Sequence, residues 1–352
     1  MFNLAVDQEH VTLAFGLRWI ETLSRRYEHI DVVTMTAGAY QLPANVRVWS
    51  VGREHGYSEL RRALRFYGIV WHIMRERRID VVFTHMIPIF AVLFWPVARL
   101  TGLRNVLWYA HGATPRTLRI AHRLVDRVVS PTPESFRLPS SKVTFIGHGV
   151  EGERFRAVAR QPGPALRIIT VGRTAPSKGL DVLIEALARW RHDGEWRLTV
   201  VGGGTSDSEA AYADDLRRLA LGTPVAHRIV FTGRKSSEEV AAVLAGADVF
   251  VNLSETGSLD KAIVEAMASG CPVISSNDAF GSIARAGGFA QYVIARTPEA
   301  VRAALSELAE MSPAARQALA DRQSEIAHRS HTLDGLMGRL CGVLDAEAKR
   351  GA

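Results

Sequence analysis

Residues 248–277 read DVFVNLSETGSLDKAIVEAMASGCPVISSN and carry the clearest structural signal in the chain. The apolar, β-branched run at 248–252 predicts a strand, and the small polar residues after it predict a loop. Asp260 is placed to cap a helix that ends before a second short strand at 272–275. A loop that leaves a strand and opens a helix presents backbone N–H groups at the positive end of the helix dipole. The stretch is therefore suited to binding a phosphate or pyrophosphate.

Glu265 lies about one turn inside this predicted helix. In dinucleotide sites an acidic residue accepts hydrogen bonds from the ribose hydroxyls, and Glu265 is a candidate for that role. The alternative is a surface glutamate on an amphipathic helix. The helix by itself leaves both interpretations open.

The run VEAMASGCPVISS at 264–276 resembles the nucleotide-sugar motif of the retaining glycosyltransferases of family 4, which have the GT-B fold. In that family two glutamates bracket seven other residues, the first contacting the donor sugar and the second the ribose. Glu265 matches the second position, whereas Gly257 stands at the first. The resemblance therefore implies a nucleotide contact at Glu265 and a departure from the family at the sugar contact.

A second motif, GRTAPSKG at 172–179, follows the apolar predicted strand 166–171 and matches the family pattern G-R-x-x-x-x-K-G. Arg173 and Lys178 flank a turn before a helix and are predicted to bind the donor diphosphate, since Arg can bind it bidentately and Lys acts as a point charge. The same resemblance implies a donor contact at Gly172 of this motif. It also implies donor contacts at the ends of two further predicted strands, at Gly202, Gly233 and Arg234.

His111 directly follows the predicted strand 105–110. Ligands of open α/β sheets bind at the carboxyl ends of the strands, although a single histidine is most often structural. The resemblance implies that His111 faces the donor sugar. The expected catalytic set is therefore His111, Arg173 and Lys178.

The residues just before the central helix complete the expected donor site. Asp260 is predicted to be the helix N-cap, which draws the preceding loop inward so that Gly257 and Ser258 face the donor sugar. Lys261 is predicted to add a positive charge beside the diphosphate. A solvent-facing lysine is the alternative for Lys261, because a cation is unfavourable at the start of a helix.

The length of 352 residues suits two domains, and 47% hydrophobic with 22% charged residues is typical of a globular protein. Alternating predicted strands and helices indicate an α/β fold with parallel sheets. They include a strand at 291–294 and a helical stretch at 315–349, and the glycine and prolines at 161–164 indicate a linker. We expect a GT-B architecture of two doubly wound Rossmann-like domains facing across a cleft. The expected parts are an acceptor-binding domain at 1–160, a nucleotide-sugar-binding domain at 161–330, and a C-terminal helix at 331–352 that packs back on the first domain.

The formal net charge of +7 is unevenly distributed. Residues 1–160 hold 22 Lys and Arg against 13 Asp and Glu, while residues 161–352 hold 21 against 23. This asymmetry indicates an anionic partner for the first domain. No nucleic-acid-binding motif is present, so anionic lipid head groups are the better candidate. The predicted helix 58–78 is rich in arginine and aromatic residues and suits a membrane interface, but an ordinary crossover helix with a solvated arginine face is the alternative.

Two cysteines, Cys271 and Cys341, cannot form a disulfide framework, which indicates a reducing compartment. The start of the sequence lacks the pattern of a secretory signal. The apolar stretch 86–98 is too short to span a membrane and contains two prolines. We therefore expect a cytoplasmic protein, peripheral on the inner face of the cell membrane.

The predicted activity is transfer of a hexose from a UDP- or GDP-sugar to a lipid-linked or glycan acceptor, with retention of anomeric configuration. No Asp-x-Asp occurs in the chain, so neither a metal nor another cofactor is expected beside the sugar nucleotide. A sugar-nucleotide-binding subunit without turnover is the main alternative. A dehydrogenase is rejected because the acidic residues after Gly202-Gly203-Gly204 come too early, and an epimerase would need acids that face the sugar.

Overall fold

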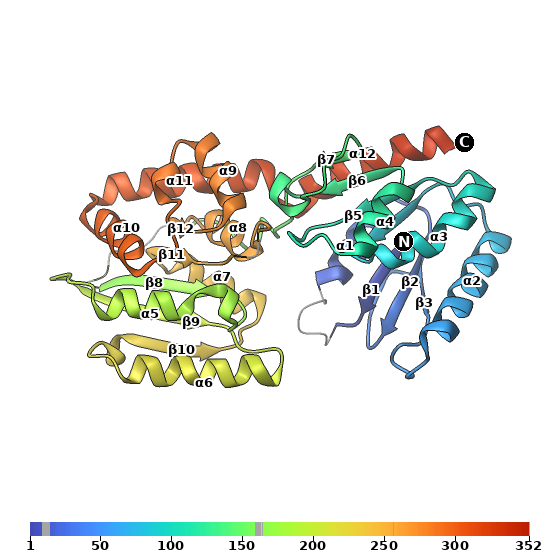
Figure 1. The fold of residues 1–352 in the computed structure, drawn as a ribbon. Helices are drawn as coiled ribbons and strands as arrows, with labels where there is room; N and C mark the ends of the chain where they lie inside the picture. Colours follow the sequence, from blue (N-terminus) through green and yellow to red (C-terminus); the bar gives the residue numbers. More distant parts are fainter. Residues whose placement is uncertain (9–14, 159–162, 164, 256, 352) are drawn as a thin grey trace. The chain divides into compact units, whose positions relative to one another are not determined.

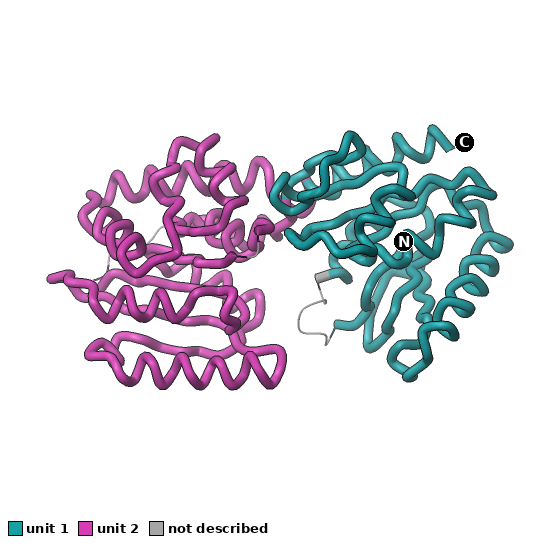
Figure 2. Tube along the Cα trace, in the orientation of Figure 1, with its two compact units in different colours: residues 1–147, 336–352 teal, residues 148–335 magenta. Residues whose placement is uncertain are grey.

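The computed structural model describes residues 1–8, 15–158, 163, 165–255 and 257–351. The chain divides into two compact units, each containing one parallel sheet (Figures 1 and 2). Unit 1 comprises residues 1–147 and 336–352, and unit 2 comprises residues 148–335.

Unit 1 contains a seven-stranded parallel sheet in the order β3-β2-β1-β4-β5-β6-β7. Its strands are β1 (Phe2–Val6), β2 (Ile30–Ala37), β3 (Val46–Ser50), β4 (Val82–His85), β5 (Asn105–Trp108), β6 (Arg127–Ser130) and β7 (Val143–Phe145). Its helices are α1 (Phe15–Ser24), α2 (Glu59–Glu76), α3 (Pro88–Thr101), α4 (Arg116–Leu124) and the short 3₁₀ helix η1 (Pro133–Ser135). From Leu336 onward the last helix, α12 (Leu333–Gly351), also belongs to this unit.

The short first strand is central to this sheet rather than peripheral. Phe2 is in register with Val33 of β2 and with Thr84 of β4. The ring of Phe2 packs against three other phenylalanines at centroid distances of 5.3–5.6 Å, Phe66, Phe90 and Phe94. Five residues are enough because both neighbouring strands and this aromatic cluster hold the strand in place.

Unit 2 contains a five-stranded parallel sheet in the order β10-β9-β8-β11-β12. Its strands are β8 (Ala165–Val171), β9 (Glu195–Val201), β10 (Ile229–Gly233), β11 (Val249–Asn252) and β12 (Val273–Ser275). Its helices are α5 (Leu180–Ala188), α6 (Asp207–Leu221), α7 (Ser237–Ala245), α8 (Lys261–Ala268), α9 (Asp278–Gly287), α10 (Pro298–Glu310) and α11 (Pro313–Ser330). Three 3₁₀ helices complete it, η2 (Pro176–Lys178), η3 (Ala226–Arg228) and η4 (Ala290–Tyr292).

The boundary between the units lies after Gly147, earlier than the boundary after residue 160 that we placed from composition. Residues 148–155 belong to unit 2 because Val150 pairs with Thr332 and the N–H of Val150 donates to the carbonyl of His331 at 2.8 Å. Phe155 is 1% exposed in the core of unit 2. Residues 161, 162 and 164 of the composition-based linker lie outside the described residues.

Two further elements differ from the sequence-based expectation. The strand expected over 291–294 is wrong, since Ala290–Tyr292 forms η4 and only Val293 bridges to Ser275. Tyr292 is instead fully buried, with its hydroxyl donating to Glu307 at 3.0 Å. The helical stretch expected over 315–349 is divided between α11 and α12, because the residues between them pair with Val150.

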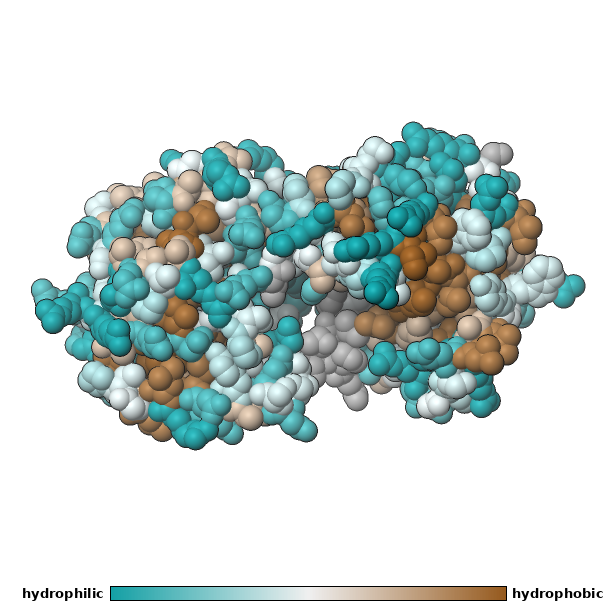
Figure 3. Space-filling view, in the orientation of Figure 1, coloured by the Kyte–Doolittle hydropathy of each residue, from teal (hydrophilic) through white to brown (hydrophobic). Residues whose placement is uncertain are grey.

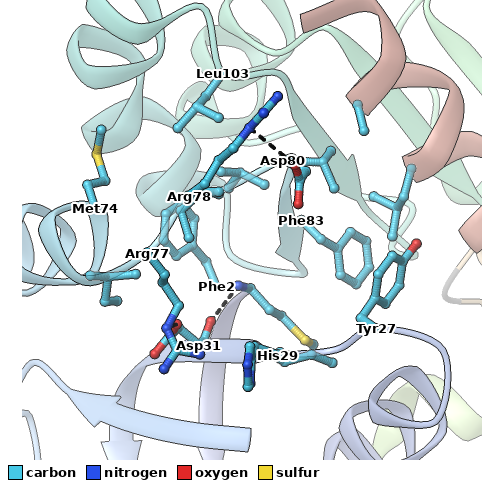
Figure 4. Close-up of a pocket in the computed structure, with 18 of the residues that line it drawn as sticks. Phe2, Tyr27, His29, Asp31, Met74, Arg77, Arg78, Asp80, Phe83 and Leu103 are labelled. Atoms are coloured by element: carbon cyan, nitrogen blue, oxygen red, sulfur yellow. Dashed lines mark hydrogen bonds and ion pairs between the residues drawn. The ribbon is translucent and has the colours of Figure 1, made fainter. Parts of the chain in front are cut away.

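Unit 1 also contains a cavity of about 740 Å³ at the amino-terminal ends of β1, β2 and β4 (Figure 4). Its walls are mainly apolar, and Phe2 and Phe83 lie among its lining residues. Its polar residues carry both signs of charge, as in the Arg78–Asp80 ion pair of 3.7 Å. The cavity lies at the edge of the sheet opposite to the carboxyl ends of the strands, where open α/β sheets bind their ligands.

Candidate functional site

Three glycines bring the backbones of β8, β9 and β10 together at the carboxyl edge of the unit 2 sheet. The N–H of Gly172 donates to Val201 O at 3.0 Å, and the N–H of Gly202 donates to Gly233 O at 2.8 Å. Gly202 has a φ of +136°, and a Cβ atom there would lie 1.7 Å from the carbonyl oxygen of Gly172. Only glycine permits this approach, so the edge is built for close contact between backbone segments.

Lys178 is the last residue of η2, the short helix that follows β8, and its side chain points to the start of α8. Its amine forms an ion pair with the carboxylate of Asp260, and both side chains are only 13% exposed. The contact joins two segments that lie 82 residues apart in the chain. A cation and a carboxylate are thus held together between the turn after β8 and the first turn of α8.

Arg173 and Lys178 do not form one clamp in the structure. The Arg173 guanidinium donates to Glu209 of α6 at 2.7 Å and is half exposed. Hydrogen bonds from Thr205, followed by the positive charge of Arg173, hold the pKa of Glu209 below its usual value. Arg234 is exposed, and its guanidinium donates to the carbonyl of Gly204. The two arginines therefore lie near the segment that follows β9, and Lys178 lies near the start of α8.

Asp260 is the N-cap of α8, and its Oδ1 accepts a hydrogen bond from the N–H of Ala262 at 3.3 Å. Its Oδ2 accepts from Lys178 and, at 2.9 Å, from the amide of Asn252. Burial raises the pKa of Asp260, but the charge of Lys178 and the hydrogen bonds outweigh burial, so the net pKa is lowered. The negative charge at the start of α8 is thus the chain's own carboxylate, at the place where the sequence suggested a phosphate.

Lys261 does not stand apart as an isolated cation. Its amine lies 3.0 Å from the carboxylate of Glu265, one turn further along α8. Glu265 is buried, in contrast to the alternative of a surface glutamate. Burial raises the pKa of Glu265, while the charge of Lys261 acts in the opposite direction. The helix therefore holds a buried carboxylate whose ionised form depends on a neighbouring lysine.

The loop before α8 is held in place by the residue that caps α9. Gly257 is buried with a φ of +67°, and Ser258 is half-buried. The carbonyl of Ser258 accepts a hydrogen bond from the Asn277 amide at 2.9 Å, and Asn277 also caps α9. A left-handed backbone at 257 favours glycine over the glutamate of the family motif.

His111 lies in unit 1, whereas the other predicted site residues lie in unit 2. It follows β5 and is exposed, its N–H donates to the carbonyl of Ser135 at 3.2 Å, and its Nδ1 accepts from the N–H of Ala113 at 3.0 Å. The imidazole is thus oriented by its own loop at the carboxyl edge of the unit 1 sheet.

Sequence reasoning missed the polar residues that support the site. Asn252, the last residue of β11, accepts a hydrogen bond from the Ser254 hydroxyl at 2.7 Å while donating to Asp260. Arg296 donates to the carbonyl of Pro176 at 2.6 Å and pairs with Glu255 at 2.7 Å, which ties η2 to the loop after β11. Asn252 carried a positional signal, since it ends a strand at the binding edge. Arg296 belongs to no motif.

Within the described residues, no group of three or more His, Cys, Asp or Glu side chains is arranged to hold a metal ion. Over the same part of the chain, no helix combines the length and the apolar character needed to cross a bilayer. Cys271 and Cys341 are both buried free thiols.

Residues 165–311, which contain the unit 2 site, match the family model described as Glycosyl transferases group 1, and the resemblance seen in the motifs of this region is confirmed. The chain is 32% identical over 223 residues to a GDP-mannose-dependent alpha-(1-6)-phosphatidylinositol monomannoside mannosyltransferase of Mycobacterium tuberculosis, covering 53% of this chain and 55% of the relative. A GDP-mannose-dependent alpha-mannosyltransferase of the same organism is 34% identical over 169 residues, covering 45% and 40%. The chain thus spans about half the length of the curated relatives it matches.

Solved structures match the fold over nearly the whole chain. Sucrose-phosphate synthase from Thermosynechococcus elongatus has a TM-score of 0.79 at 16% identity, covering 100% of this chain and 98% of that one. The Anabaena HepE protein in complex with UDP has a TM-score of 0.75 at 16% identity, covering 98% and 100%. The expected GT-B fold class, with two parallel α/β sheets, is confirmed.

Proposed function

We propose that this chain is a glycosyltransferase that moves a hexose from a UDP- or GDP-sugar to a lipid-linked or glycan acceptor with retention of configuration. One observation carries the proposal: Lys178 and the buried Glu265 lie on adjoining segments at the carboxyl edge of the unit 2 sheet, joined through the start of α8. Lys178 is assigned to the donor diphosphate and Glu265 to the ribose hydroxyls. The GDP-mannose named for the curated mannosyltransferases and the UDP named for the HepE complex support a nucleotide donor.

In the proposed reaction the bond between the anomeric carbon and the diphosphate oxygen breaks, and the acceptor oxygen forms the new glycosidic bond on the same face. The acceptor proton passes to the departing phosphate oxygen, so no protein base is needed. Lys178 and the arginines Arg173 and Arg234 supply positive charge for the leaving diphosphate. His111 is assigned to the donor hexose. The proposed reaction therefore needs no metal.

The experiment that tests the proposal follows turnover of radiolabelled UDP- and GDP-hexoses by the purified chain, with and without EDTA. We expect slow hydrolysis of one donor, unaffected by EDTA, and a product of retained configuration by NMR. Turnover that EDTA abolishes would contradict metal independence. Inverted product would contradict the proposed retention.

A sugar-nucleotide-binding subunit without turnover is the second candidate, and one observation favours it. Gly257 replaces the sugar-contacting glutamate of the family motif and adopts a left-handed backbone conformation. Tight nucleotide binding with no release of labelled sugar, in the presence of cell-derived acceptor lipids as well as water, would establish this function instead.

Glu265→Gln is expected to weaken binding of the preferred nucleoside diphosphate by about tenfold or more, because the charged acceptor of the ribose hydroxyls is lost. The variant should also distinguish ribo- from 2′-deoxynucleotides less well than the parent. Calorimetric titration with both forms measures the two effects. A parent protein that binds the two forms equally would show that Glu265 does not contact the 2′-hydroxyl.

We assign unit 1 to the acceptor side and to an anionic membrane surface on the cytoplasmic face. Helix α2 leaves three apolar residues exposed along one stripe, Leu60 at 72%, Leu64 at 65% and Trp71 at 63%. Arg75 lies over the Trp71 ring at 5.7 Å, and Figure 3 shows apolar side chains at the surface in the region of α2 and α3. Exposed apolar residues among arginines suit an interface with anionic lipid.

Leu64→Glu is expected to reduce co-sedimentation with vesicles that contain phosphatidylglycerol at least severalfold, because it places a negative charge on the proposed contact stripe. Leu221→Glu is the matched control, since Leu221 is 75% exposed on α6 of unit 2. Equal binding by the parent, Leu64→Glu and Leu221→Glu would show that α2 does not contact the membrane.

A further inference from the structure

Two consecutive residues at the start of α8 each contact one of the side chains that we assign to donor binding. Asp260 pairs with Lys178, and Lys261 pairs with Glu265 at 3.0 Å. The first pair links separate segments, and the second follows the i,i+4 spacing of a helix. We propose that Asp260 and Lys261 are positioning residues, which hold the side chains of Lys178 and Glu265 in the orientations that the donor needs. This inference rests on the proposed function and goes beyond it.

Other groups besides Lys178 hold the Asp260 carboxylate in place. It accepts from Asn252 at 2.9 Å and from the Ala262 N–H at 3.3 Å, and Asn252 is itself held by the Ser254 hydroxyl at 2.7 Å. A carboxylate with these partners cannot follow Lys178 when the lysine turns to a ligand. It therefore sets the direction from which the Lys178 amine reaches the diphosphate, and its own charge repels phosphate.

The Lys261–Glu265 pair has a different consequence. The ionisable groups that act most strongly on Glu265 are Lys261 on its own helix, Asp260 at the helix cap and Glu151 from the segment before β8. Burial raises the pKa of Glu265, both carboxylates raise it further, and Lys261 lowers it. An ionised carboxylate accepts the ribose hydroxyls best. Lys261 thus extends nucleotide binding to lower pH without touching the nucleotide.

The first arm of the test compares the steady-state kinetics of Asp260→Asn with those of the parent. Asparagine has nearly the same shape and is also a good N-cap, so α8 keeps its start. We expect kcat to fall by about tenfold or more, with a donor KM no higher than that of the parent, because orientation is lost while phosphate repulsion is relieved. Asp260→Glu, which keeps the charge, should recover part of the lost kcat. Asp214→Asn, in an exposed ion pair with Arg217 of 2.6 Å on α6, is the matched control.

The second arm measures nucleoside diphosphate affinity against pH. Lys261→Met should move the acidic loss of affinity to higher pH, Lys261→Arg should restore the parental profile, and Arg329→Met, from the exposed Glu325–Arg329 pair, should match the parent. An unshifted profile in Lys261→Met, or a raised KM at unchanged kcat in Asp260→Asn, would overturn the inference. A parent that binds no UDP or GDP would instead contradict the proposed function itself.

Discussion

Lys178→Ala is expected to lower kcat/KM for the sugar nucleotide by about 10- to 150-fold, equivalent to about 1.5–3 kcal/mol of transition-state stabilisation. The reason is that Lys178 is a nearly buried cation at the edge where the diphosphate is assigned, so solvent screens its charge little. Arg173 is half exposed and already paired with Glu209, so Arg173→Ala should have the smaller effect of the two. Initial rates of donor turnover measure both.

The loss of Lys178 also leaves Asp260 without its cation, so activity and folding must be separated. Lys178→Arg keeps the charge and should retain more activity than Lys178→Ala at similar stability. Lys349→Ala removes an exposed lysine from α12 and should leave the kinetics at the parental level. Parental kcat/KM in a folded Lys178→Ala variant would show that Lys178 does not act at the donor site.

Gly202→Ala is expected to destabilise unit 2 by about 3 kcal/mol or more. An added Cβ would lie 1.7 Å from the Gly172 carbonyl oxygen, and the φ of +136° is unfavourable for any residue with a side chain. The strands β8, β9 and β10 must separate to accommodate it. Hydrogen-exchange mass spectrometry should show faster exchange in these three strands and unchanged exchange in β1 and β4.

Gly338→Ala is the control for this substitution. A Cβ at Gly338 meets no atom within 4 Å inside α12, so alanine should leave stability unchanged or slightly raised. Parental exchange in β8 and β9 of Gly202→Ala would show that the strand ends can separate at little cost.

The parts of the site that follow from local chemistry could be predicted from the sequence. The Asp260 cap, the strand before it and the turn carrying Lys178 all depend on short-range rules for caps and strand ends. The partners of the charged side chains could not be predicted in this way. That Lys178 reaches Asp260, and that Arg173 reaches Glu209 instead, depends on how distant segments pack.

The supporting residues show the same limit. Arg296 binds two segments of the site from a position without a motif, and only the folded chain brings it there. The boundary after Gly147 was missed for a related reason. Composition marks proline and glycine at 161–164 as a linker, whereas the pairing of Val150 with Thr332 decides where unit 2 begins.

Calorimetric titration of the purified chain with UDP, GDP, ADP and dTDP tests most directly the claim that the carboxyl edge of the unit 2 sheet binds a nucleoside diphosphate. The account predicts that UDP or GDP binds in a 1:1 complex without added metal and that Lys178→Ala weakens this binding. A folded parent protein that binds none of the four, or that binds one of them equally well after Lys178→Ala and after Glu265→Gln, would contradict it.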